Sequence, residues 1–290
     1  MQLSEIHALA QRFPYLQLRF FLQLQQRGRL PAFKGSLWHG WLGHMIKGSP
    51  PLYQLLYGEH EGQQPKPYVI RTDGNRQEQW QAGELITFDV ILLGAATQAA
   101  EHLIAHLSKT PCCGLGFERL EVSIHSVATV TPQGLQPGLH HGVLADWLSA
   151  KPLTLWHEVA LQLESPLRIK YQGQIVKQGP LPLSFLLEQI ARRWSLLTHF
   201  WVDDHPHWRT LLQQALPNLG DHQTQGTCLR VEDWQRYSVR QKEHLPFGGL
   251  VGQLCYQGDI APALFWLQIG ERLHIGGKTT FGLGQYQLIA

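Results

Sequence analysis

Two histidines and a lysine stand close together in the segment GSLWHGWLGHMIKG, residues 35–48. Histidine transfers protons near neutral pH, and a lysine ammonium stabilises negative charge that develops on a phosphate. Together they could cleave RNA without a metal, because the adjacent 2′-hydroxyl can attack the phosphorus once a base, an acid and a cation are in place. Whether His39, His44 and Lys47 can cooperate depends on the element that carries them.

The run from Leu37 to Lys47 is predicted to form a helix with Ser36 as its N-cap. At about 100° per residue, its large apolar residues share one half of the helix, which predicts the buried face. These residues are Leu37, Trp38, Trp41, Leu42, Met45 and Ile46. The opposite half carries His39, Gly40, Gly43, His44 and Lys47. There the two histidines are about 140° apart, and Lys47 is about 60° from His44.

We therefore expect His44 to act as general acid or base, with His39 as its partner and Lys47 as the cation for the phosphorane charge. The two glycines would leave room for a nucleic-acid backbone on this face. The alternative is structural, with His39 packed beside Trp38 and His44 merely exposed. Reserve candidates from loops around the helix are Tyr57, His60, His140 and His141, and His274 could serve binding, chemistry or structure.

A glycine-rich loop precedes the C-terminal end of the sequence, and its glycines are Gly276, Gly277, Gly282 and Gly284. Glycines permit positive φ and leave backbone N–H groups accessible, so a phosphate can approach closely. Lys278 adds a charge, and Thr279 and Thr280 add hydroxyl donors. The alternative is a tight turn required only for packing. A dinucleotide fingerprint is excluded because a strand, not a helix, is predicted to follow.

The net charge is only +2, but the charges are unevenly distributed. No acid lies between Glu5 and Glu59, where the bases are Arg12, Arg19, Arg27, Arg29, Lys34 and Lys47. A second acid-free stretch, between Glu164 and Glu188, carries Arg168, Lys170 and Lys177, and Arg192 and Arg193 follow it. Such segregation indicates basic surfaces that face a polyanion, unless the bases are scattered over separate faces.

The remaining composition restricts the class of protein. Four cysteines in no paired pattern, and no apolar run long enough to span a membrane, predict a cytoplasmic protein. His102 and His106 share a helical face, but a third zinc ligand is not identifiable, so neither a metal nor a cofactor is expected.

Periodicity predicts an α+β fold. Strands are expected at 16–24, 85–93 and 118–128, with helices at 37–47 and 95–107. The second half repeats this order, with strands near 155–163, 229–237, 249–256 and 283–288 and helices at 183–198 and 261–270. Strand, helix, strand, then strand, helix, strand is one ferredoxin-like (RRM-like) module. Two tandem modules are therefore predicted, residues 1–150 and 151–290, with the glycine-rich loop in the second.

Three segments near the C-terminus, DWQRYSVRQ, LPFGGLVGQLCYQGD and LHIGGKTTFGLGQYQL, are the most distinctive part of the sequence. Together with GSLWHGWLGHMIKG, GLGFERLEV and SPLRIKYQG, they resemble the Cas6 family of CRISPR-associated proteins, in which two ferredoxin-like domains stand side by side. The chain departs from many relatives in having His39-Gly40 where they have Arg-Gly. Active-site positions vary within the family, so no catalytic residue is transferred directly.

The resemblance implies an endoribonuclease that binds CRISPR repeat RNA, cleaves precursor crRNA without a metal and leaves a 2′,3′-cyclic phosphate. RNA contacts are expected from the glycine-rich loop and from Arg168, Arg192, Arg193, Arg236 and Arg240. Relatives often join an effector complex, so other Cas proteins are expected as partners. The alternative is a non-catalytic RNA-binding subunit of a CRISPR ribonucleoprotein, and a small-molecule enzyme is a more distant third.

Overall fold

Alternating residues of the first strand separate two sides of the N-terminal sheet. In the computed structural model, which describes residues 3–59, 62–148, 157–205, 207–219, 222–224, 228–232, 235–238 and 243–289, this strand is β1 (Pro14–Leu24). Its even-numbered side chains from Leu16 to Leu24 are buried. They join one core with residues of helices α2 (Gly35–Met45), α3 (Pro50–Tyr57) and α4 (Ala100–Lys109).

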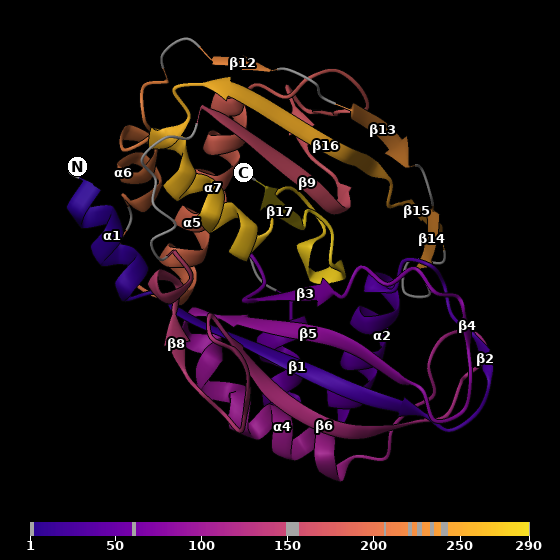
Figure 1. The fold of residues 1–290 in the computed structure, drawn as a ribbon. Coiled ribbons are helices and arrows are strands. Elements are labelled where there is room, and N and C mark those ends of the chain that lie inside the picture. Colours follow the sequence, from indigo (N-terminus) through magenta and orange to yellow (C-terminus); the bar gives the residue numbers. More distant parts are fainter. Residues whose placement is uncertain are drawn as a thin grey trace.

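The N-terminal sheet has the order β3-β5-β1-β6-β7, and its strands are antiparallel. Its other strands are β3 (Tyr68–Thr72), β5 (Leu85–Leu93), β6 (Val122–Thr131) and β7 (Gly134–Pro137), and β8 (Gly142–Val143) pairs with the start of β1. The helices lie on one side of this sheet, and the C-terminal half of the chain lies on the other (Figure 1).

The C-terminal sheet repeats the same topology with the order β12-β16-β9-β17. Its strands are β9 (Glu158–Leu167), β12 (His222–Thr224), β16 (Gly249–Gly258) and β17 (Tyr286–Ile289). Strand β13 (Cys228–Glu232) also pairs with β16. Its helices are α5 (Leu183–Trp201), α6 (Trp208–Gln214) and α7 (Ala261–Leu273). Both halves follow the ferredoxin-like order, so the predicted fold class is confirmed.

Short elements connect these units. The paired strands are β2 (Gly28–Arg29) with β4 (Gln79–Trp80), β10 (Lys170–Tyr171) with β11 (Gln174–Ile175), and β14 (Gln235–Ser238) with β15 (Glu243–Pro246). The 3₁₀ helices are η1 (Ile46–Gly48), η2 (Gly94–Ala99), η3 (Leu144–Trp147) and η4 (Thr279–Phe281). Within the described ranges, no helix combines the length and the apolarity that a membrane crossing requires.

Element boundaries differ from the sequence-based predictions in several places, including the starts of three elements in the first half. Helix α2 begins at Gly35, and the predicted cap Ser36 lies inside it with its buried Oγ lacking a hydrogen-bond partner. The helix expected from residue 95 begins as the 3₁₀ helix η2. The strand expected from residue 118 begins at Val122, because Leu115 and Leu120 first close a turn through two backbone hydrogen bonds.

The two halves are packed against each other. Helix α1 (Leu3–Gln11) contributes to the core of the C-terminal half. Tyr15, Val69 and Ile91 do so as well, from the side of the first sheet that faces the C-terminal half. Polar contacts also cross the junction: Trp201 Nε1 donates to Pro65 O at 2.8 Å, and Arg76 pairs with Glu232 at 3.1 Å. The predicted boundary at residue 150 lies outside the described residues and stays a prediction.

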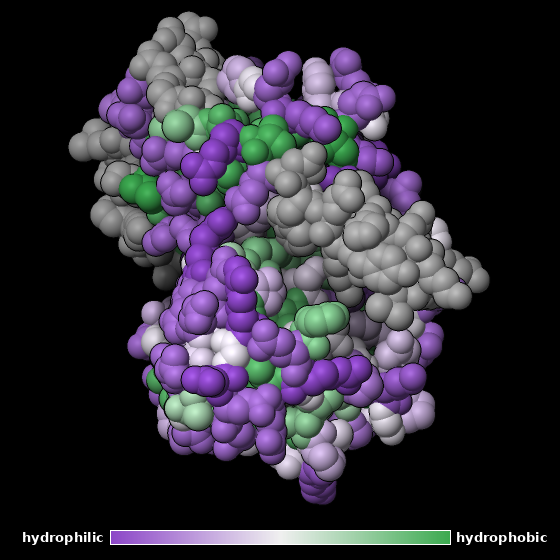
Figure 2. Space-filling view, turned by 90° about the vertical axis from the view of Figure 1, so that its right-hand side faces the viewer, coloured by the Kyte–Doolittle hydropathy of each residue, from purple (hydrophilic) through white to green (hydrophobic). Residues whose placement is uncertain are grey.

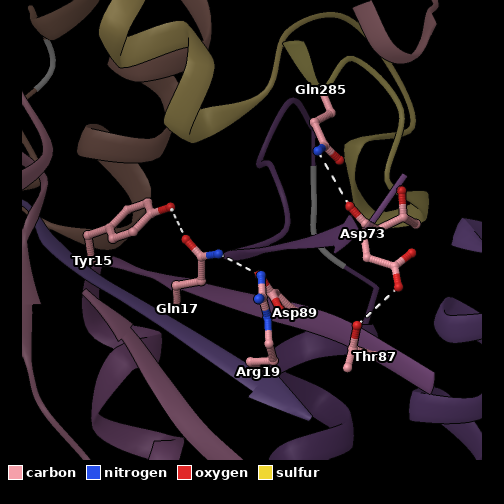
Figure 3. Close-up of polar contacts among 8 residues, drawn as sticks. Tyr15, Gln17, Arg19, Asp73, Thr87, Asp89 and Gln285 are labelled. Atoms are coloured by element: carbon pink, nitrogen blue, oxygen red, sulfur yellow. Dashed lines mark hydrogen bonds and ion pairs between the residues drawn. The ribbon is translucent and has the colours of Figure 1, made fainter. Parts of the chain in front are cut away.

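A row of polar side chains runs along the side of the first sheet that faces away from its helices (Figure 3). Tyr15 Oη donates to Gln17 Oε1, and Gln17 Nε2 donates to Asp89 Oδ2 at 2.5 Å. Arg19 binds the same carboxylate through Nε and Nη2, at 2.7 and 3.0 Å. Because Asp89 is only 2% exposed, these bonds supply the partners that a buried carboxylate requires.

Candidate functional site

His39 lies where the two halves of the molecule meet. It is on α2, and its Nδ1 is 3.1 Å from the carbonyl oxygen of Thr280 in η4, although the two residues are 241 positions apart. The same atom is 3.0 Å from Tyr68 Oη on β3. In Figure 1 the yellow C-terminal segment descends to β3 and α2 at this point, and η4 contacts both elements.

Aromatic rings surround the imidazole. The ring centroid of Phe281 is 3.6 Å from that of His39, that of Tyr57 is 4.9 Å away, and that of Tyr68 is 6.4 Å away in a stacked orientation. Tyr57 Oη also donates to the carbonyl oxygen of His39 at 2.6 Å, which ties α3 to α2. Burial raises the pKa of Tyr68 well above its usual value, so its hydroxyl keeps its proton at neutral pH.

These contacts favour one tautomer of His39. A carbonyl oxygen can only accept a hydrogen bond, so a bond to Thr280 O places the proton on Nδ1, and Tyr68 Oη then accepts from the same N–H. In the neutral ring the basic lone pair then lies on Nε2. An imidazole held in this way has a fixed orientation and one nitrogen that can take up a proton.

Backbone hydrogen bonds within the chain hold the glycine-rich loop in place. Gly276, Gly282 and Gly284 have positive φ values, and so does Lys278, at 64°. The N–H groups of Gly277, Gly282 and Gly284 donate to Arg168 O, Thr279 O and Pro166 O, respectively. Those glycines therefore shape the loop while their N–H groups are already bonded within the chain. Thr279 is buried as well.

Close approach of the loop to α2 depends on Gly35. A Cβ atom at this position would lie 1.9 Å from Phe281 O, a distance that no real contact reaches. Lys278 Nζ lies 5.4 Å from the ring centroid of Phe247 and 5.8 Å from that of Phe281. Lys278 and His39 therefore contact the same ring, that of Phe281.

His44 and Lys47 are exposed, whereas His39 is partly buried. The five large apolar residues from Trp38 to Ile46 are buried as predicted, and Leu37 is partly buried. Gly43 does not provide an open surface: it is buried, and a Cβ there would lie 2.6 Å from Tyr57 Cε1. Gly40 does provide an open surface, since no atom lies within 4 Å of a Cβ placed on it.

The first acid-free stretch does not form one basic surface. Arg12 pairs with Asp203, Arg19 with Asp89 and Arg29 with Glu78. Lys34 is only 3% exposed, and its Nζ donates to Asn75 O at 2.7 Å. Four of the six charges are therefore paired or buried by residues from elsewhere in the chain, and Arg27 and Lys47 are the exposed bases that stay available to a polyanion.

The second stretch does assemble. Arg168, Lys170, Arg192 and Arg193 line one cavity of about 470 Å³, together with Gly276, Gly277 and Lys278 of the glycine-rich loop. Arg236 lies on β14, and Arg240 lies outside the described residues. The charge pattern alone could not distinguish these two outcomes, because ion-pair partners are contributed by distant segments.

The reserve histidines lie elsewhere. His140 and His141 line a separate cavity of about 610 Å³ near Tyr15 and Trp147. His274 is fully buried, and burial, followed by the charges of Arg71 and Arg193, lowers its pKa well below the usual value. His60 lies outside the described residues. Among the residues that the structure describes, no group of three His, Cys, Asp or Glu side chains could hold a metal.

Two residues of the His39 environment, Tyr68 and Phe281, were not found from the sequence, and Thr280 was expected only as a hydroxyl donor of the glycine-rich loop. Tyr68 occurs in a short apolar strand that resembles any buried strand, and Thr280 and Phe281 belong to the other half of the chain. Only the docking of η4 onto α2 brings them to His39, and no local pattern signals that contact.

Two family models match this chain. Residues 161–286 match the model described as CRISPR-associated endoribonuclease Cas6, and residues 13–54 and 50–146 match one described as an N-terminal domain. A search of curated proteins found no match.

Solved structures share the fold over nearly the whole chain. A chain of a partial Cas6-RT-Cas1–Cas2 complex is 17% identical, with a TM-score of 0.65, over 97% of this chain and 47% of that chain. A Cas6 product complex is 16% identical, with a TM-score of 0.58, over 96% of this chain and 100% of that one. Thermus thermophilus Cas6 is 15% identical, with a TM-score of 0.56, over 96% of this chain and 99% of that one.

At these identities the likeness establishes the fold, and this chain spans less than half of the first of the three. The family match covers the C-terminal domain that carries the glycine-rich loop. Residues 161–286 are therefore similar to the CRISPR-associated endoribonuclease Cas6, and the whole chain has the paired ferredoxin-like fold of the solved Cas6 structures.

Proposed function

We propose that this chain is an endoribonuclease that binds CRISPR repeat RNA and cleaves precursor crRNA by attack of a 2′-hydroxyl on the adjacent phosphorus. The observation that carries the proposal is the contact between His39 and the glycine-rich segment, which joins a proton-transfer group to the part of the chain that matches the Cas6 model. The products are a 2′,3′-cyclic phosphate and a free 5′-hydroxyl.

His39 is the group best placed to transfer a proton. Its Nδ1–H is held by Thr280 O, and its ring is packed between aromatic neighbours, so Nε2 has a fixed direction. Fixed orientation contributes to catalysis because the reacting atoms need not be ordered again at each turnover. Nε2 then either takes the proton of the attacking 2′-hydroxyl or supplies one to the leaving 5′-oxygen.

Lys278 is a cation close to this arrangement. Its ammonium group contacts the same phenylalanine ring as His39 and can stabilise the charge that develops on the phosphorane oxygens. The side chains around His39 are aromatic, hydroxyl and amine groups, which are poor ligands for Mg²⁺. This composition supports a metal-independent reaction.

His44 and Lys47 remain candidates on the same helix. Both are exposed, which suits contact with RNA, but no described neighbour fixes the orientation of either. We therefore place His39 first in proton transfer and assign His44 and Lys47 to RNA contact at the edge of the site. Arg168, Arg192 and Arg193 contribute RNA binding at the adjacent cavity.

The test is single-turnover cleavage of labelled repeat RNA, taken from a CRISPR array close to the gene, in excess EDTA. Cleavage should persist without added metal. A single 2′-deoxy substitution at the scissile nucleotide should abolish it, because the nucleophile is then missing. Metal-dependent cleavage, or cleavage of the 2′-deoxy substrate, would contradict the mechanism. Tight binding with no cleavage at all would favour a non-catalytic RNA-binding subunit.

Other Cas proteins are proposed as partners. The similar chains in the two Cas6-RT-Cas1–Cas2 structures come from complexes with such proteins, and this chain spans 47% and 29% of them. Co-purification of a tagged chain from its host, with identification of the bound proteins, tests this proposal.

A further inference from the structure

A cavity beside the glycine-rich loop has walls that suit a specific ligand. It lies between α5, the β10–β11 hairpin and the loop, and Pro65 of the first domain closes one side. Arg168, Lys170, Arg192, Arg193 and Lys278 line it, and no acid is among its lining residues. A volume of about 470 Å³ is in the range of small-ligand sites, and a nucleic-acid duplex is far too wide to enter it.

Arg193 is the residue that points most directly to a ligand. Its Nε donates to Leu273 O at 2.7 Å, but its Nη2 is buried and has no hydrogen-bond partner. Desolvation lowers the pKa of Arg193 to about 10, so the side chain is still charged at neutral pH. A buried charged donor without a partner is costly, and an anion in the cavity would remove that cost.

The cavity also has an apolar wall and one neutral polar group. Ile169, Ile175 and Leu196 supply apolar surface, and the Gln189 amide on α5 faces the same space. An amide has both donor and acceptor atoms, as the edge of a nucleobase does. Basic groups beside an apolar wall are the combination that binds an unpaired nucleotide, because a phosphate and a base are recognised together.

We propose that this cavity holds one unpaired nucleotide of the bound RNA, with its phosphate at Arg193 and Lys278, its base against Ile175 and Leu196, and Gln189 at the edge of the base. This inference rests on the proposed function, since it requires that the chain binds RNA. Lys278 borders the cavity and also contacts Phe281, whose ring packs against His39. The nucleotide therefore lies at a fixed, short distance along the RNA from the cleaved bond, and the cavity determines specificity there.

The first experiment locates this nucleotide without using cleavage. Repeat RNA with a 2′-deoxy substitution at the scissile nucleotide is prepared as a series in which each position in turn is abasic. Binding to the unmodified protein should fall on the order of 10- to 100-fold at one unpaired position. In Leu196→Trp, which fills the cavity, the same abasic substitution should have no further effect.

The second experiment tests the assigned contacts. Gln189→Ala should reduce the preference for one base at that position and leave binding of RNAs with the other bases nearly unchanged. Arg192→Ala should weaken binding of every RNA and reduce its salt dependence, and the matched variant is Lys177→Ala, because Lys177 is an exposed base that does not line the cavity.

Two results would overturn the proposal: an abasic profile that is identical in Leu196→Trp and the unmodified protein, or an unchanged base preference in Gln189→Ala. A protein that does not bind repeat RNA would instead contradict the proposed function. Short single-stranded homopolymeric RNAs then test the cavity independently. At least one of the four should bind more weakly to Leu196→Trp, and equal binding of all four would reject the nucleotide site.

Discussion

His39 and His44 lie on the same helix but have different surroundings. The glycine-rich segment covers His39 and leaves His44 exposed. We predict that His39→Ala reduces the single-turnover rate of repeat cleavage by about 10²- to 10⁴-fold while RNA affinity changes little, because a proton-transfer group acts mainly in the transition state. The measurement is cleavage at saturating protein together with equilibrium binding.

The control for this prediction is His125→Ala, which removes an exposed histidine on β6. His44→Ala and Lys47→Ala are expected to act chiefly on affinity. A normal rate in His39→Ala combined with a slow rate in His44→Ala would move the chemistry to the exposed side of α2.

Asp89 is predicted to be the most important single carboxylate for stability. It accepts hydrogen bonds from Gln17 and from Nε and Nη2 of Arg19, and it is nearly fully buried. Asp89→Ala leaves these donors without their acceptor and should lower the free energy of unfolding by about 2 to 4 kcal/mol. Denaturant unfolding measures the change. Removing the exposed ion pair by Arg29→Ala should have no measurable effect, and equal losses in both variants would contradict this argument.

His274 should make the protein less stable in mild acid. Burial holds its pKa well below its usual value, so below about pH 6.5 the unfolded chain binds a proton that the folded chain does not. Stability therefore decreases as the pH falls through this range. His274→Asn should make melting temperatures less dependent on pH between about 7 and 5, since it removes the titrating imidazole and keeps a polar side chain at this position. If the melting temperatures of the variant and the unmodified protein fall equally with pH, a group other than His274 causes the loss of stability in acid.

Helix α2 contains two glycines that should respond in opposite ways to alanine. Gly35→Ala introduces a Cβ that overlaps Phe281 O, so it should lower the melting temperature and slow RNA cleavage by displacing η4. Gly40→Ala meets no atom and should stabilise the helix by up to about 1 kcal/mol. Thermal unfolding of both variants checks the pair. A Gly35→Ala protein as stable as Gly40→Ala would show that the loop is not tightly docked on α2.

Most of the longer helices and strands could be predicted because their periodicity is local, but α1, α3, α6 and β3 were not predicted. The apolar half of α2 and the alternation in β1 both follow from residues within one element. The contact between His39 and Thr280 could not be predicted in this way, since it depends on how two domains dock. For the same reason the sequence favoured His44 over His39, and the basic residues near Arg19 could not be assigned to acidic partners in other strands.

The two halves share hydrophobic packing as well as polar contacts. Hydrophilic side chains cover most of the lower lobe in Figure 2, and hydrophobic ones are visible between the lobes and on the upper lobe. The larger core cluster includes residues of α1, of the first sheet and of α5 and α7. Neither half can therefore bury all of its apolar surface alone.

We predict that the complete chain unfolds in one calorimetric transition, because this shared core couples the two halves. Residues 157–290 expressed alone should be less stable or insoluble, since they lack Ile6, Leu9 and Phe13. Two well-separated transitions in the complete chain, or a stable isolated C-terminal half, would show that the junction contributes little.

The position of helix α1 has a consequence for synthesis of the protein. Its apolar residues pack with the core of the C-terminal half, and His7 lies against Phe265 of α7, with ring centroids 4.5 Å apart. At about 5 to 20 residues per second, a ribosome needs on the order of 10 to 50 seconds to proceed from α1 to α7. During that time the helix lacks its partners in the C-terminal half, so it is translated well before α7 but reaches its final place only after α7 has been made.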